Sequence, residues 1–223
     1  MKLYSVLLAT LLLNLFFFSC ANSTSENTPP VETGNSVETV LSMLTDTRTT
    51  QYFTNDNVPE GDIIQILNAG KSATSGMNSQ PWHFGVILNQ SMIQRIAATP
   101  SSGPAGPPPG APASAAFPKA GFKNAPAAIA IACTENNDFS AGLATQNMIV
   151  AATALGYGTK IVRGGADILN SEENRALLQV PAQMKTIMIL IIGQVDPSID
   201  VTADGATGPS PRKSLEEVAT IVK

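Results

Sequence analysis

The sequence predicts an α+β domain that mixes helices and strands. Helix and strand patterns follow one another along the chain, but not as the clean strand-helix-strand alternation of a parallel sheet. Only 13% of the 223 residues are charged and 43% are hydrophobic, so a large core is possible. The length is enough for one ordinary domain and too short for two generous ones.

Residues 1–19 are typical of a signal peptide. Lys2 precedes an apolar run over residues 3–18, whose length suits the hydrophobic region of a signal better than a helix that spans a membrane. We therefore exclude this segment from the folded domain.

Cys20 is the predicted site of lipid attachment. Small Ser19 followed at once by Cys20 resembles the lipobox of bacterial lipoproteins, in which the cysteine becomes the lipidated first residue. Residues 20–36 are polar and contain two prolines, as expected of a tether between a membrane and a domain over residues 37–223. An ordinary cleaved signal or an N-terminal membrane anchor is the alternative.

Helical spacing of apolar residues, together with capping signals, predicts the helices of this domain. Ser36 is a plausible N-cap for the first, and Gly70 is the expected stop of the second. The third is long and nearly uncharged, so we expect it to be buried on most sides, at the centre of the molecule or of a dimer. Ser214 and Glu217 form a capping box for the last helix. The predicted helices cover residues 37–44, 59–70, 139–155 and 171–178 and begin again after Ser214.

Short apolar runs predict four strands, over residues 82–88, 127–133, 159–162 and 185–193. Trp82 and Phe84 alternate on the first strand, which favours a place in the core. His83 then lies on the opposite face, at the surface or at the edge of a cavity. Cys133 ends an apolar strand and is expected to be an inert buried thiol.

Residues 100–121 contain seven prolines and four glycines, so this stretch is neither a helix nor an interior strand. A loop of this length in a compact domain is usually functional or disordered. Two roles remain possible for this stretch: a lid over a site, or an inert surface loop.

The composition removes several kinds of chemistry. With 13 basic and 17 acidic residues the net charge is −4, so nucleic-acid binding is disfavoured. His83 is the single histidine, which excludes multi-histidine zinc sites. Cys20 and Cys133 are too far apart for a CxxC pair. An organic cofactor that brings its own reactivity is the remaining candidate, with no residue singled out as catalytic.

Three short segments, residues 47–53, 74–84 and 154–158, resemble motifs of the nitroreductase family of flavin-dependent enzymes. The string Asn-Ser-Gln-Pro-Trp-His-Phe in the second segment is the most specific. The resemblance extends in matching order from about Val37 to the C-terminus. It implies a nitroreductase-like fold, with a central, mainly antiparallel sheet flanked by helices, in a domain-swapped homodimer that binds FMN at the subunit interface.

The resemblance also implies which residues contact FMN. The phosphate carries nearly two negative charges, and Arg212 and Lys213 precede a helix N-terminus that suits it. Ser75 and Asn78 fit the edge of the flavin ring, and would serve the FMN whose phosphate the other chain holds. Gly164 would let the backbone of residues 162–164 approach N5 closely. The implied set is Arg48, Thr49, Gln51, Ser75, Asn78, Arg163, Gly164, Arg212 and Lys213.

The first motif departs from the family pattern, which has two basic residues, a serine, any residue and a further basic residue. Here only Arg48 is basic, Thr49 replaces the serine, and Gln51 occupies the last basic position. One ion pair to phosphate contributes about 1.5–3 kcal/mol. We therefore expect weaker FMN binding, or an altered potential because Gln51 cannot neutralise N1.

These expectations predict an FMN-dependent oxidoreductase that transfers a hydride through flavin N5 to a nitroaromatic, a quinone or another electron-poor acceptor. The donor is NAD(P)H or, because an exported enzyme is cut off from cytosolic NADPH, a membrane quinol or partner redox protein. The expected location is the bacterial cell envelope, with Cys20 as the lipid anchor. Two alternatives stay open: a non-catalytic flavin- or ligand-binding surface lipoprotein, and a structural lipoprotein with an empty cleft.

Overall fold

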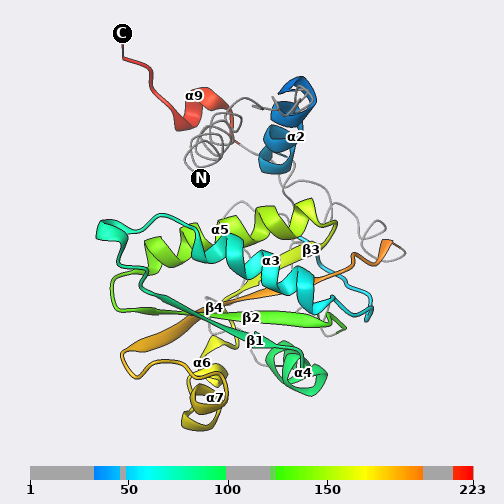
Figure 1. Ribbon diagram of the computed structural model, residues 1–223, viewed down its shortest axis with the longest axis vertical. Coiled ribbons are helices and arrows are strands. Elements are labelled where there is room, and N and C mark those ends of the chain that lie inside the picture. Colours follow the sequence, from blue (N-terminus) through cyan, green and yellow to red (C-terminus); the bar gives the residue numbers. More distant parts are fainter. Residues whose placement is uncertain (1–32, 46–48, 99–121, 123, 198–212, 223) are drawn as a thin grey trace, which may run out of the picture. The chain divides into compact units, whose positions relative to one another are not determined.

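The computed structural model describes residues 33–45, 49–98, 122, 124–197 and 213–222 (Figure 1). The chain divides into two compact units, Met1–Glu38 and Thr39–Lys223. The sheet and both of its helical layers belong to the second unit.

Four antiparallel strands form the central sheet, in the order β1-β2-β4-β3 (Figure 1). The predicted α+β class and antiparallel sheet are therefore confirmed. The central strands β2 and β4 are covered on both faces, which explains why their sequences are almost continuously apolar. The outer strands β1 and β3 are the two edges of the sheet. The strands are β1 (Trp82–Ile87), β2 (Ala127–Thr134), β3 (Gly158–Val162) and β4 (Met184–Gly193).

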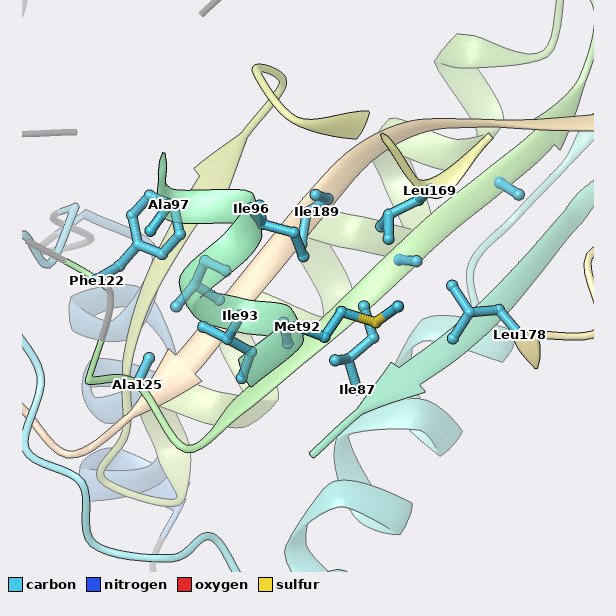
Figure 2. Packing of buried hydrophobic residues seen from close by; sticks show 14 of the residues in the cluster. Ile87, Met92, Ile93, Ile96, Ala97, Phe122, Ala125, Leu169, Leu178 and Ile189 are labelled. Atoms are coloured by element: carbon cyan, nitrogen blue, oxygen red, sulfur yellow. The ribbon is translucent and has the colours of Figure 1, made fainter. Parts of the chain in front are cut away.

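Helices α3 (Glu60–Lys71) and α5 (Asp138–Ala154) cover one face of the sheet, where Ile129 and Leu190 belong to their shared core (Figure 1). Alternate residues of the same strands point to the opposite face, as the two-residue period of a strand requires. There they meet helices α4 (Gln90–Ala98) and α6 (Ala166–Leu169), and Leu178, directly after α7 (Glu172–Leu177), belongs to the same core. Figure 2 shows Ile96 of α4 beside Ile189 of β4, and Ile93 of α4 belongs to the same cluster.

The predicted end of α3 at Gly70 is wrong, because the helix continues to Lys71. A Cβ atom on Gly70 would lie 2.7 Å from the Cγ atom of Met148 on α5. The glycine is therefore required by the close packing of two helices and not by a turn. The Asn147 side chain of α5 donates a hydrogen bond of 3.2 Å to the Ala69 carbonyl at the same contact.

Two helices have a serine cap at the N-terminus. The Ser171 hydroxyl accepts a hydrogen bond from the backbone N–H of Asn174 at 3.4 Å, and Ser214 forms the expected capping box with Glu217 before α9 (Leu215–Val218). The predicted cap at Ser36 is wrong, because α2 (Thr33–Thr45) already begins at Thr33. Among the described helices, none is long and apolar enough to cross a membrane.

Helix α5 is less buried than the sequence predicts. One face packs on the sheet through fully buried residues such as Ala144 and Met148. The other face points away from the sheet, and Phe139 on it is 78% exposed. The expectation of burial on most sides is therefore wrong for the single chain.

Candidate functional site

The first motif lies against the beginning of β3. The backbone N–H of Thr50 donates a hydrogen bond of 2.9 Å to the carbonyl of Thr159. Thr50 is buried, and a Cβ atom on Gly158 would overlap its hydroxyl oxygen. Thr49, by contrast, is exposed. Because Thr50 is anchored to β3, the neighbouring Thr49 lies at the surface beside this edge strand.

Gln51 and Lys160 form a buried polar pair at the same edge. Gln51 is 4% exposed and Lys160 is 8% exposed. The Lys160 ammonium donates a hydrogen bond of 2.6 Å to Gln51 Oε1, and it lies 5.6 Å from the centroid of the Phe122 ring. Lys160 is not among the predicted site residues. The available signal was a lysine between Thr159 and Ile161 in an otherwise apolar strand.

The backbone turns sharply where β3 ends. Arg163 is exposed, Gly164 is half-buried, and Gly165 is buried with a φ of +92°. A Cβ atom on Gly165 would lie 3.0 Å from Cγ2 of Ile96, so both the conformation and the space require glycine. The structure therefore brings Arg163 and Gly164 to the same edge of the sheet as Thr49 and Gln51.

The second motif forms an exposed, strained loop directly before β1. Met77, Asn78 and Gln80 have φ values of 51°, 55° and 44°, which non-glycine residues rarely adopt. Ser75 stabilises this conformation, because its hydroxyl accepts a hydrogen bond of 2.9 Å from the backbone N–H of Gln80. The Gln80 side chain donates to Asn78 Oδ1 at 3.3 Å. Strain of this kind costs about 1–3 kcal/mol for each residue and is concentrated at functional sites.

The two groups of predicted site residues lie at opposite edges of the sheet. Ser75 and Asn78 precede β1, whereas Arg163 and Gly164 follow β3. Three strand spacings separate these edges, which is about 14 Å. A single chain therefore does not bring both groups onto one flavin ring.

The remaining predicted residues have simpler outcomes. Lys213 is exposed immediately ahead of α9. Arg48, Arg212 and Cys20 lie outside the described residues, as does the proline-rich segment at residues 100–121.

A cavity of about 800 Å³ opens near the ends of β2 and β4 that lie away from Lys160. It contains none of the predicted flavin contacts. Arg175, its largest cationic side chain, donates to the carbonyls of Met184 at 2.6 Å, Pro181 at 2.9 Å and Ala182 at 3.2 Å. The cavity is lined by Cys133, Thr134, Glu135, Asn136, Asp138, Asn170, Arg175, Ala182, Gln183, Met184, Lys185 and Ile187.

The predicted inert thiol is confirmed as a buried group. Cys133 is 2% exposed, and its thiol lies 3.6 Å from Asp138 Oδ1. Burial, reinforced by the Asp138 carboxylate, raises the pKa of Cys133 to about 11. The thiolate, which is the reactive form, is therefore disfavoured at neutral pH.

In β1 the predicted alternation of Trp82 and Phe84 on one face is confirmed, but their predicted burial in the core is only partial. Trp82 and Phe84 lie on one face with their ring centroids 6.3 Å apart, but both are only half-buried. His83 is also half-buried, and its Nε2 lies 2.8 Å from the Leu178 carbonyl oxygen. Because a carbonyl only accepts, Nε2 carries the hydrogen in this contact. His83 therefore joins β1 to the end of α7.

Comparisons with known proteins identify the family and the fold. The model of the nitroreductase family matches residues 44–194. A candidate NADH dehydrogenase/NAD(P)H nitroreductase from Methanothermobacter thermautotrophicus is 30% identical over 126 residues, which cover 53% of this chain and 58% of that protein. The chain thus matches somewhat more than half of the length of this relative.

Solved structures show the same fold. The FMN-dependent nitroreductase from Mycobacterium smegmatis, solved in complex with NADPH, has a TM-score of 0.66 at 18% identity, with 84% of this chain and 100% of that chain covered. A nitroreductase with bound FMN from Desulfitobacterium hafniense has a TM-score of 0.65 at 21% identity, with coverage of 82% and 98%. The family model spans most of the chain, and the fold and motif order agree with it. The chain belongs to the nitroreductase family.

Proposed function

We propose that this protein is an FMN-dependent oxidoreductase that works as a homodimer. The observation that carries the proposal is the β3 edge. The segment that carries Thr49 and Gln51 contacts the start of β3 through Thr50 and Lys160, and Arg163 and the glycine turn follow the end of the same strand. Family membership and the FMN-containing structures that share the fold support it.

The donor set at this edge fits FMN. A flavin ring offers acceptors on its pyrimidine edge, which amide and backbone N–H groups can meet. The phosphate needs cations and hydroxyl donors, for which Thr49 and Lys213 are suited, together with Arg48 and Arg212. The turn at Gly164 and Gly165 would bring the backbone close to the ring. Bound FMN would supply the redox chemistry, accepting a hydride at N5 and passing it to an electron-poor acceptor such as a nitroaromatic or a quinone.

A second copy of the chain would complete the site. Ser75 and Asn78 of the partner would reach the flavin that the β3 edge of the first copy holds, because one chain separates them by the width of the sheet. Two further features support a dimer. Phe139 leaves an apolar side chain exposed on the nearly uncharged helix α5, and Met77 is fully exposed at the tip of the strained loop.

Nicotinamide is the proposed electron donor in solution. The M. thermautotrophicus relative is named for NADH and NAD(P)H, and the M. smegmatis structure holds NADPH. We further propose that residues 1–19 direct export and that Cys20 anchors the protein by lipid to the bacterial envelope. In that compartment a membrane quinol or a redox protein would replace NAD(P)H.

The test is to purify the full chain in detergent and to record its visible spectrum. A released cofactor identified as FMN by chromatography, and NADPH oxidation that depends on an added nitroaromatic, would support the proposal. A chain that binds no flavin even after incubation with FMN would refute it. Tight FMN binding without turnover would favour the non-catalytic flavin-binding alternative. The donors to be tried are NADPH, a quinol and a redox protein that has been reduced with dithionite.

A further inference from the structure

The buried pair Lys160 and Gln51 has an unusual composition for a sheet edge. Transfer of an ammonium group from water to a protein interior is costly unless polar groups surround it. The oxygen of Gln51, at 2.6 Å, and the face of the Phe122 ring, at 5.6 Å from the ammonium, contribute to that environment. Gln51 Oε1 is therefore held by a positive charge.

An ammonium group only donates hydrogen bonds, so it determines which end of the Gln51 amide faces it. With Oε1 bound to Lys160, the Nε2 group is the end of the amide that faces away from the ammonium. The nearby charge also polarises the amide, which strengthens Nε2 as a donor. Lys160 thus makes the neutral Gln51 side chain an oriented and more strongly polarised donor.

The pair lies between the two segments that the proposed function assigns to FMN. Gln51 follows Thr49 by two residues, and Lys160 precedes Val162, the last residue of β3, by two residues. Two residues of strand span about 7 Å. The backbone of Lys160 is therefore close to the end of β3 and to the turn that follows it, and burial of the side chain weakens screening of its charge by water.

We infer that Lys160 is a positioning residue for the flavin, acting through Gln51. It orients and polarises the Gln51 amide toward the pyrimidine edge of bound FMN, and so replaces the charge that a basic residue at position 51 would provide. This inference rests on the proposed function. Because negative charge grows on that edge when FMN is reduced, the pair stabilises reduced FMN more than oxidised FMN.

The test measures two equilibria on the full chain in detergent. Fluorescence titration gives the dissociation constant for oxidised FMN, and anaerobic titration against a reference dye gives the midpoint potential. We expect Lys160→Met to weaken the binding of reduced relative to oxidised FMN about tenfold, which lowers the two-electron potential by about 30 mV. Lys160→Arg, which keeps the charge, should restore most of this difference.

A second variant protects the test against misfolding. Gln51→Glu keeps the size of the side chain and gives Lys160 an anionic partner, so the pair stays satisfied while its net charge is cancelled. It should lower the potential in the same direction as Lys160→Met. The matched control is Lys185→Met, which removes an exposed lysine near the opposite end of β4 and should leave the potential unchanged.

The outcomes separate the two proposals. Equal potentials in the wild type, Lys160→Met and Gln51→Glu, all with FMN bound, would overturn the role of Lys160 and leave the proposed function standing. An equal shift in Lys185→Met would show a general charge effect and overturn the inference as well. A wild-type chain that binds no FMN would overturn both.

Discussion

The hydroxyl group of Tyr157 donates a hydrogen bond of 2.5 Å to the carboxylate of Asp62. Tyr157 stands immediately before β3, and Asp62 lies in the first turn of α3, so this contact joins a helix to the strand edge that carries the candidate site. The hydrogen bond, with a smaller contribution from burial, raises the pKa of Tyr157 to about 12.

We expect Tyr157→Phe to lower the free energy of unfolding by about 1–3 kcal/mol, because it leaves a half-buried carboxylate without this donor. Urea denaturation followed by circular dichroism measures the change. Asp62→Asn keeps an acceptor for the hydroxyl and should cost less. A Tyr157→Phe variant as stable as the wild type would show that the contact does not contribute.

The same contact predicts a loss of stability in strong base. Below pH 10 the Tyr157 hydroxyl is protonated in both the folded and the unfolded chain. Between pH 10 and about 12 the unfolded chain releases this proton while the folded chain retains it, so stability falls as the pH rises. Unfolding titrations across this range should show a smaller decline in Tyr157→Phe. Parallel declines in the two proteins would contradict the assignment.

Gly165→Ala should destabilise the fold, because its φ of +92° and the 3.0 Å approach to Ile96 leave no room for a side chain. The expected cost is about 1–3 kcal/mol. Gly61→Ala is the control, since nothing lies within 4 Å of its Cβ position in α3. It should stabilise the helix by about 0.5–1 kcal/mol. If the free energy of unfolding changed in the same direction in both variants, the special requirement for glycine at position 165 would be contradicted.

Phe139→Arg should weaken dimerisation at least tenfold, because it replaces the large apolar side chain exposed on α5 by a charged one. Leu177→Arg changes another exposed apolar residue, on α7, and should leave the dimer intact. Sedimentation velocity over a range of protein concentrations distinguishes them. Equal dimer populations in all three proteins would place the interface elsewhere. A monomeric wild type would contradict the proposed dimer.

Cys20→Ser should abolish membrane anchoring. The wild type is expected to partition with membranes and to incorporate labelled palmitate in bacterial cells, whereas the variant should do neither. Cys133→Ser controls for thiol chemistry elsewhere in the chain and should label normally. Incorporation that survives the loss of Cys20 would rule this residue out as the lipidation site.

Apolar periodicity was sufficient to predict the central strands, because β2 and β4 are covered on both faces and hence contain few polar residues. The same kind of signal is present in α4, which was not predicted. Its buried residues Met92, Ile93, Ile96 and Ala97 have helical spacing, and the Asn89 side chain accepts from the Met92 backbone N–H at 3.0 Å. The role of Gly70 was misread, because it depends on Met148 of another helix. Contacts between distant segments have no local pattern that would reveal them.

The candidate site was predictable to a similar extent. The motifs located Thr49, Ser75 and Gly164 on segments that the structure places at sheet edges. The pairing of Gln51 with Lys160 could not be predicted, because 109 residues separate the two and only the fold brings them together. Likewise, sequence alone did not indicate that Gly165 is the residue in the left-handed conformation.

The positions of β1 and β3 at opposite edges have a thermodynamic consequence. A ligand that needs groups from both edges can be fully bound only between two copies, so subunit association and ligand binding share one coupling free energy. Dilution of the protein should then weaken apparent affinity, and added ligand should favour association by the same factor. Binding curves recorded at several protein concentrations would therefore report on the quaternary structure without any measurement of turnover.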